Sequence, residues 1–207
     1  MKVLLVNGSP HENGCTARAL KEIAVTLTEC GVDSEVFNIG NVPIAGCSGC
    51  MACATLHKCR IDDLVNEFVE KAKDFDGFVF GSPVHYASAA GALSAFMDRA
   101  FYSDKCGHNN NFATKPAAAI VSARRAGTTA ALDQINKYFG ISAMPIITST
   151  YWNMVHGNTP EQVEEDLEGL RTMRNLARNM AWFLKMKEAA NIPAPKYEYK
   201  PSTNFIR

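Results

Sequence analysis

The sequence has no excess of charge of either sign, because 21 lysine and arginine residues balance 21 aspartate and glutamate residues over 207 positions. Proteins that bind nucleic acids or anionic membranes need a basic excess, so both functions are disfavoured. The sequence also lacks an apolar run near the roughly 18 to 20 residues that a membrane-spanning helix requires. Charged residues make up only 20% of the chain and hydrophobic residues 47%, a balance that argues against disorder and provides for a full core.

The first residues lack the apolar segment of a secretion signal. Residues 3–6 are an apolar run of four, which is too short for such a signal and is typical of a buried strand. We therefore expect a cytoplasmic protein. Seven cysteines are many for such a chain, but their number is odd and four of them fall between Cys47 and Cys59. This distribution fits a metal or redox site better than a secreted disulfide framework.

Short β-rich segments alternate with segments of helical periodicity, which is the pattern of βα units in a parallel sheet. Both common doubly wound strand orders fit this pattern, and a total of five strands favours the order 2-1-3-4-5. The sequence thus predicts an α/β protein, a flavodoxin-like three-layer sandwich with a five-stranded parallel sheet. The expected strands are 3–6, 35–39, 77–80, 117–121 and 145–148. The expected helices are 16–29, 62–73, one that carries Leu93 and Phe96 on its inner face, 128–139 and 159–187.

The chain divides into one domain and a tail. Residues 1–190 form the expected domain, which includes a cysteine-rich loop at 43–60. Residues 191–207 contain three prolines and are expected to be an extended C-terminal tail.

Ligands of such sheets bind beyond the carboxyl ends of the strands, near the point where the strand order reverses. The loops after strands one, three and four meet there. The first of these loops, residues 8–16, offers Ser9, Asn13 and Thr16 beside a helix start, where free N–H groups favour a phosphate. It has no lysine and no G-x-G-x-x-G pattern, so it is neither a Walker A loop nor a Rossmann loop. An ordinary βα turn capped by Thr16 fits the same residues equally well.

The other two loops add groups that suit a planar, anionic ligand. In the loop after the third strand, Pro83 and Tyr86 are placed to flank a flat ring. The loop after the fourth strand puts Arg124 and Arg125 at the same edge of the sheet. A loop tyrosine is more often a packing residue and an arginine pair is usually solvated surface, but here three loops converge on one place.

Residues 9–16, 81–86 and 151–157 together resemble the NAD(P)H-dependent FMN reductase branch of the flavodoxin-like superfamily. The resemblance covers nearly the whole chain. It implies that the first loop binds the FMN phosphate, with contacts from Ser9, His11, Asn13, Cys15 and Thr16. It also implies that the second loop holds the isoalloxazine ring, through Ser82, Pro83, Val84, His85 and Tyr86, with Ser122 and Arg124 nearby. His11 departs from the pattern, because many relatives carry an arginine there.

Four cysteines on one loop form the pattern C-x2-C-x2-C-x5-C: Cys47, Cys50, Cys53 and Cys59. The first spacings match those of bacterial ferredoxin-type clusters, whereas zinc usually takes two C-x2-C pairs separated by a long gap. The loop resembles that of iron–sulfur flavoproteins, a subset of the same branch, which implies a [4Fe-4S] cluster on these cysteines. Zinc, free thiols and a disulfide are the alternatives. His57, inside the pattern, is either exposed or a further ligand.

The other candidate residues have simpler interpretations beside their functional ones. The remaining cysteines are interpreted as ordinary buried or loop thiols: Cys15, Cys30 and Cys106. Three polar or aromatic residues after the expected fifth strand are predicted either to contact a flavin or a neighbouring subunit, or simply to pack their own loop: Trp152, Asn153 and His156.

The sequence therefore predicts an FMN-dependent oxidoreductase whose flavin carries the chemistry without a side-chain nucleophile. With a cluster, it passes electrons between FMN and that cluster, and its redox partner is a ferredoxin, a nicotinamide or a quinone-like small molecule. Without a cluster, it is an NAD(P)H-dependent flavin or quinone reductase. The rivals are a non-enzymatic flavodoxin-type electron carrier, which the neutral charge disfavours, and a metal-regulated binding module. The cysteine insert and the tail favour a homodimer or homotetramer.

Overall fold

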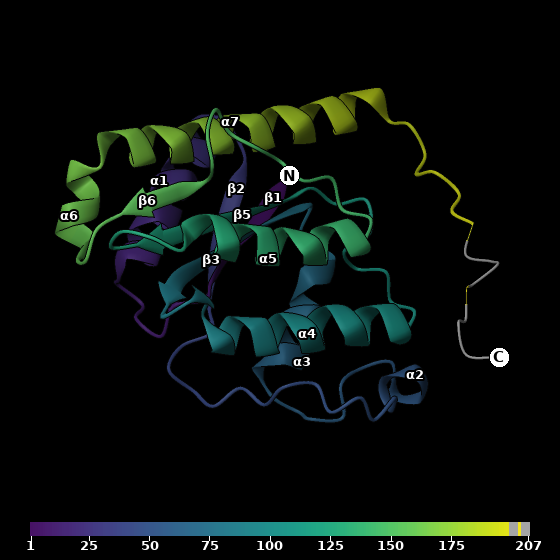
Figure 1. Cartoon of the computed structure of the whole chain (residues 1–207). Helices are drawn as coiled ribbons and strands as arrows, with labels where there is room; N and C mark the ends of the chain where they lie inside the picture. Colours follow the sequence, from purple (N-terminus) through teal and green to yellow (C-terminus); the bar gives the residue numbers. More distant parts are fainter. Residues whose placement is uncertain (199–202, 204–207) are drawn as a thin grey trace.

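A parallel sheet lies between two helical layers in the computed structural model, which describes residues 1–198 and 203 (Figure 1). Its strands pair in the order β2-β1-β3-β5-β6. Their bounds are β1 Lys2–Asn7, β2 Asp33–Asn38, β3 Gly77–His85, β5 Ala117–Ala123 and β6 Met154–His156. The two-residue strand β4, Ser88–Ala89, pairs antiparallel with β3 and stands outside this order. The five parallel strands thus have the predicted order 2-1-3-4-5, and the flavodoxin-like three-layer sandwich is confirmed.

Each face of the sheet is covered by its own helices. One face carries α1 (Cys15–Glu29), α6 (Pro160–Glu165) and α7 (Leu167–Ala190), and the other carries α3 (Leu64–Lys71), α4 (Gly91–Cys106) and α5 (Thr128–Ile141). Within β1, Leu4 and Val6 pack into the core of the second face, whereas Val3 and Leu5 pack into that of the first. The run is apolar throughout because both sides of the strand are buried. None of the helices in the described residues is long and apolar enough to cross a membrane.

The fifth parallel strand lies further along the chain than the sequence predicts. Residues 145–148 make only one bridge, from Ile146 to β5, and the prediction of a strand there is wrong. The chain returns to β5 at Asn153, whose side-chain amide donates to the Ala119 carbonyl at 3.0 Å and whose carbonyl accepts from the Val121 N–H at 3.0 Å. These two bonds align the next three residues, β6, with the end of β5.

The last helix is divided rather than continuous over residues 159–187. Asp166 leaves the helical conformation, with a ψ of 72°. Its carboxylate accepts from the N–H groups of Gly169 at 2.9 Å and His156 at 2.7 Å, so it caps α7 and ties that helix to β6. Thr159 caps the short α6, as the sequence predicts. Residues 191–198 contain no helix or strand, and the rest of the expected tail, apart from residue 203, lies outside the described residues.

Two glycines bring the loop after β1 close to the strand β3. The N–H of Gly8 donates to the carbonyl of Gly81 at 2.8 Å. A Cβ on Gly8 would lie 2.7 Å from that oxygen and 2.8 Å from a methyl carbon of Leu93. A Cβ on Gly81 would lie 2.8 Å from the Thr16 methyl group. The absence of side chains at these two positions therefore allows the loop after β1 to lie in contact with β3.

We expect Gly8→Ala to lower the free energy of unfolding by about 1–3 kcal/mol, because its methyl group would overlap a main-chain oxygen that cannot move aside. Urea unfolding measures the change. The matched control is Gly140→Ala in α5, where a new Cβ meets nothing within 4 Å. That control should keep or slightly raise stability, since alanine favours a helix. Equal stability of the two variants would show that the close approach of the loop after β1 to β3 is not required.

Candidate functional site

A large cavity, here called the strand-end cavity, opens at the carboxyl ends of β1, β3 and β5. It encloses about 1440 Å³, including the space at its mouth. All but two of the residues predicted to bind the cofactor line it: Ser9, His11, Asn13, Cys15, Thr16, Pro83, Val84, His85, Ser122 and Arg124. The structure therefore brings together three loops that lie far apart in the sequence.

The loop after β1 is held by its own polar groups. The side-chain oxygen of Asn7 accepts from the N–H of Ser9 at 3.1 Å, and the Ser9 hydroxyl accepts from the N–H of His11 at 3.1 Å. At the end of the loop, Gly14 precedes α1 without a side chain to cap the helix. The first N–H groups of α1 therefore meet no capping side chain beside the cavity, which is an arrangement suited to an anion.

Thr16 joins the first loop to the end of β5. Its side chain is buried, and its hydroxyl lies 2.8 Å from the hydroxyl of Ser122. Thr16 is inside α1 and does not cap it, so the interpretation of a plain turn capped by Thr16 is wrong. The hydroxyl pair presents two neutral polar groups at the wall of the cavity.

Ser82 and Tyr86 are the two predicted residues that do not line the cavity. Ser82 is completely buried, and its hydroxyl accepts from the N–H of Ala90 at 3.0 Å, so it fixes the start of α4. Tyr86 lies in the turn between the paired residues His85 and Ser88, fully exposed and with a φ of +58°. A role for Tyr86 in covering a planar ligand stays a prediction.

Residues 157–160 also line the cavity, although the sequence analysis gave them no cofactor role. The thiol of Cys15 donates to the carbonyl of Gly157 at 3.5 Å and links them to α1. Burial raises the pKa of the Cys15 thiol, so this group is a neutral donor. The helix start at Thr159 was visible in the sequence, but its place at the cavity follows from the position of β6.

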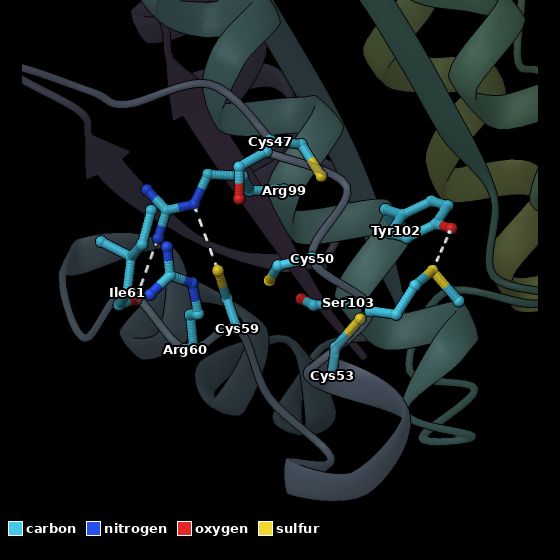
Figure 2. A pocket seen from close by; sticks show the side chains of 11 residues that line it. Cys47, Cys50, Cys53, Cys59, Arg60, Ile61, Arg99, Tyr102 and Ser103 are labelled. Atoms are coloured by element: carbon cyan, nitrogen blue, oxygen red, sulfur yellow. Dashed lines mark hydrogen bonds between the residues drawn. The ribbon is translucent and has the colours of Figure 1, made fainter.

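The cysteine loop, residues 43–60, surrounds a second and separate hollow, here called the cysteine hollow (Figure 2). All four cysteines of the C-x2-C-x2-C-x5-C pattern line it: Cys47, Cys50, Cys53 and Cys59. It encloses about 370 Å³, including its open side. The loop curls around it through left-handed residues, Gly49 at φ +63° and Met51 at φ +59°, and through the short helix α2 (Cys53–Leu56), after which His57 has φ +56°.

The thiols of the hollow differ in their electrostatic surroundings. The pKa of the Cys50 thiol is lowered by the main-chain N–H of Ala52, by Ser48 and by the positive charge of Arg60. Burial raises the pKa of the Cys53 thiol. Among residues 1–198 and 203, no three His, Cys, Asp or Glu side chains form a group that could hold one metal ion.

Two polar residues that the sequence analysis missed hold Cys59. Asn66 of α3 accepts from the N–H of Cys59 at 3.0 Å and donates to its carbonyl at 2.9 Å. Arg99 of α4, which is 1% exposed, donates through Nε to Cys59 Sγ at 3.3 Å. The signal for Arg99 was available, because a charged residue falls there among the apolar positions Phe96 and Ala100 of the helix.

His57 lies outside the lining of the cysteine hollow. Its side chain is exposed, as the simpler interpretation expected, and its Nδ1 lies 2.8 Å from the Gly107 carbonyl. Its own carbonyl accepts from the Asn109 side chain at 2.8 Å. These hydrogen bonds of His57 therefore connect the cysteine loop to the segment after α4.

Comparison with known proteins gives relatives for nearly the whole chain. The model of the NADPH-dependent FMN reductase family matches residues 1–159. An iron–sulfur flavoprotein of Methanocaldococcus jannaschii is 30% identical over 191 residues, which cover 90% of this chain and 98% of that protein. An iron–sulfur flavoprotein of Archaeoglobus fulgidus is 28% identical over 201 residues, with 88% and 97% of the two chains covered.

Solved structures share the fold at lower identity. A flavone reductase superimposes with a TM-score of 0.69 and 18% identity over 92% of this chain and 65% of its own. An NADH:FMN oxidoreductase in its apo form gives a TM-score of 0.62 and 16% identity over 88% and 89% of the two chains. Both likenesses support the flavodoxin-like arrangement of the sheet and helices.

We expect Asn66→Ala to expose the main chain of Cys59, because both of its hydrogen-bonding groups lose their partner. The free energy of unfolding should fall by about 1–3 kcal/mol, and the Cys59 amide should exchange with solvent faster. Hydrogen exchange measures both effects. Asn179→Ala is the control, since Asn179 donates to the Thr148 carbonyl at 2.7 Å on the other face of the sheet. Unchanged protection of Cys59 in Asn66→Ala would contradict this role.

Proposed function

The chain belongs to the NADPH-dependent FMN reductase family and to its iron–sulfur flavoprotein branch, and on this premise we propose that it passes electrons between FMN in the strand-end cavity and a [4Fe-4S] cluster in the cysteine hollow. The family makes the protein an FMN-dependent oxidoreductase. The link to a cluster is the proposal, and one observation carries it: four cysteines of one loop line a single hollow.

The strand-end cavity fits the terminal phosphate and the ring system of FMN. We assign the phosphate to the uncapped start of α1, where Ser9, Asn13 and Thr16 add polar groups. The ring would lie against Val84 and the end of β3, with Arg124 at the exposed rim. These residues bind and orient the cofactor, and the flavin supplies the exchange of hydride or single electrons.

The donor set of the cysteine hollow, four cysteines of one loop, supports a cluster there. Each thiolate of a four-iron cluster binds a different iron atom, so the four sulfur atoms lie around a volume rather than around one ion. Four thiolates also concentrate negative charge, and the guanidinium groups of Arg60 and Arg99 line the same hollow. Both arginines therefore stabilise the deprotonated cysteines that a cluster requires.

A cluster-free NAD(P)H-dependent flavin or quinone reductase is the second candidate, and the strand-end cavity alone would serve it. The gathering of four cysteines favours the first candidate. Membership of a reductase family favours either enzyme over a non-enzymatic flavodoxin-type carrier. The redox partner we propose is a ferredoxin, a nicotinamide or a quinone-like small molecule, and a cytoplasmic location stays a prediction.

We also propose a homodimer or homotetramer. Tyr151 and Trp152 support it, because both are more than half exposed on the loop that leads to β6 and pack edge to face with ring centroids 4.7 Å apart. An exposed aromatic pair of this kind suits an interface with a second subunit.

Substitution of any one of Cys47, Cys50, Cys53 or Cys59 by alanine should remove most iron and sulfide from protein isolated without oxygen. FMN should remain bound, because the strand-end cavity shares no lining residue with the cysteine hollow. Chemical assays of iron, sulfide and released flavin measure the outcome. Cys30→Ala is the matched control, since Cys30 follows α1 and lies outside the hollow. Full iron and sulfide in the four variants would refute a cluster on these cysteines.

Thr16→Val should weaken FMN binding about tenfold, which corresponds to about 1.4 kcal/mol, because it removes a hydroxyl from the proposed phosphate site. Titration of flavin-free protein, followed by the quenching of flavin fluorescence, gives the dissociation constant. Thr28→Val provides the control at the opposite end of α1, where the hydroxyl only donates to the Ala24 carbonyl. An unchanged affinity in Thr16→Val, or tighter binding of FAD than of FMN by the unmodified protein, would contradict the assignment.

A further inference from the structure

Arg99 is a buried cation whose hydrogen-bonding groups are almost fully used. Two of its nitrogens donate to the carboxylate of Asp63, Nη1 at 2.6 Å and Nη2 at 2.8 Å. Nη2 also donates to the Ile61 carbonyl at 2.9 Å, and Nη1 lies 3.5 Å from the Ala45 carbonyl. The remaining donor, Nε–H, is directed at the sulfur of Cys59 (Figure 2).

The guanidinium is fixed in this orientation from several sides. Asp63 is itself held, because its carboxylate caps α3 by accepting from the N–H of Val65 at 3.1 Å. Burial raises the pKa of Asp63, but the hydrogen bonds from Arg99 and Val65 outweigh that effect and bring the pKa below its ordinary value. The pair is therefore ionised at neutral pH, and the planar guanidinium has no freedom to turn away from Cys59.

We propose that Arg99 is a positioning residue that raises the midpoint potential of the cluster through its hydrogen bond to Cys59, and that Asp63 moderates this effect. The inference rests on the proposed function, since it concerns the cluster of the cysteine hollow. Reduction adds one electron to the cluster and makes it more negative by one charge, with no bond formed or broken and no proton taken up. A cation that donates to a ligand sulfur stabilises the more negative state more strongly.

The proposal predicts midpoint-potential shifts of opposite sign when each member of the ion pair is neutralised. Arg99→Gln removes the positive charge and should lower the midpoint potential. Asp63→Asn leaves Arg99 in place without its counter-charge and should raise the potential. Asparagine is also a good helix cap, so α3 should keep its start. A purely structural role would not shift the potential in opposite directions.

The experiment is an anaerobic redox titration of the cluster in the complete protein, followed by electron paramagnetic resonance of the reduced cluster. We expect Arg99→Gln to lower the equilibrium constant for one-electron reduction about tenfold, which is about 59 mV. Asp63→Asn should shift it the other way. Asp62→Asn is the control: this neighbouring carboxylate has a side chain that is 79% exposed, so solvent screens its charge and the shift should be smaller.

Each outcome decides the inference. Opposite shifts in the two variants support it. The inference is overturned by equal potentials or by shifts of the same sign. It is also overturned if both variants lose the cluster while FMN stays bound. Arg99 would then have a structural role only. If Arg99→Gln alone fails to hold a cluster, Asp63→Asn decides, and a potential that does not rise overturns the inference. Absence of iron and sulfide from the unmodified protein would instead contradict the proposed function, before any variant is considered.

Discussion

The ion pair between the buried Arg99 and the partly buried Asp63 is the interaction on which the second site depends. It joins α4 to the start of α3, and Arg99 reaches from it to the main-chain carbonyls of Ala45 and Ile61 and to the sulfur of Cys59. Such a pair contributes little net stability, but removal of Asp63 would leave the buried guanidinium of Arg99 without its counter-charge, which is destabilising. The positions of Arg99 and Asp63 relative to each other are fixed because α3 and α4 pack together, with the rings of Phe68 and Phe96 in contact at a centroid distance of 4.9 Å.

The helix α4 connects the two candidate sites. At its start, Ala90 is held by Ser82 at the end of β3, directly before the residues that line the strand-end cavity. Further along, Arg99 and Ser103 line the cysteine hollow. Arg99 lies nine positions after Ala90 along the helix, a rise of about 14 Å. A single helix thus contacts both candidate sites and would keep the two proposed redox groups at a fixed separation.

The parts of the structure that follow from local pattern could be predicted from the sequence. The buried β1, the strand order and the convergence of three loops depend on periodicity and on the rules for parallel sheets. The displaced fifth strand could not be predicted, because it depends on the side chain of Asn153 bonding to β5, a contact between distant parts of the chain. The same holds for the break at Asp166, whose carboxylate bonds to β6.

In the candidate sites too, residues within one short segment could be predicted, whereas contacts between distant segments could not. The motif residues of the first loop and the four cysteines could be recognised, since each group lies within one short segment. Arg99 and Asn66 could not be assigned to Cys59, because only the packing of α3 and α4 brings them to the cysteine loop. Ser82 was expected in a loop after residue 80, but it lies within β3, which continues to His85, and its hydroxyl bonds to Ala90 rather than facing the cavity.

The central claim is that one domain holds FMN and an iron–sulfur cluster at separate places. The most direct measurement is the composition of the unmodified protein, produced with added iron and isolated without oxygen, with flavin, iron and acid-labile sulfide assayed on one sample. The account predicts one FMN, four irons and four sulfides for each chain. Full FMN with neither iron nor sulfide would contradict it and leave a plain FMN reductase.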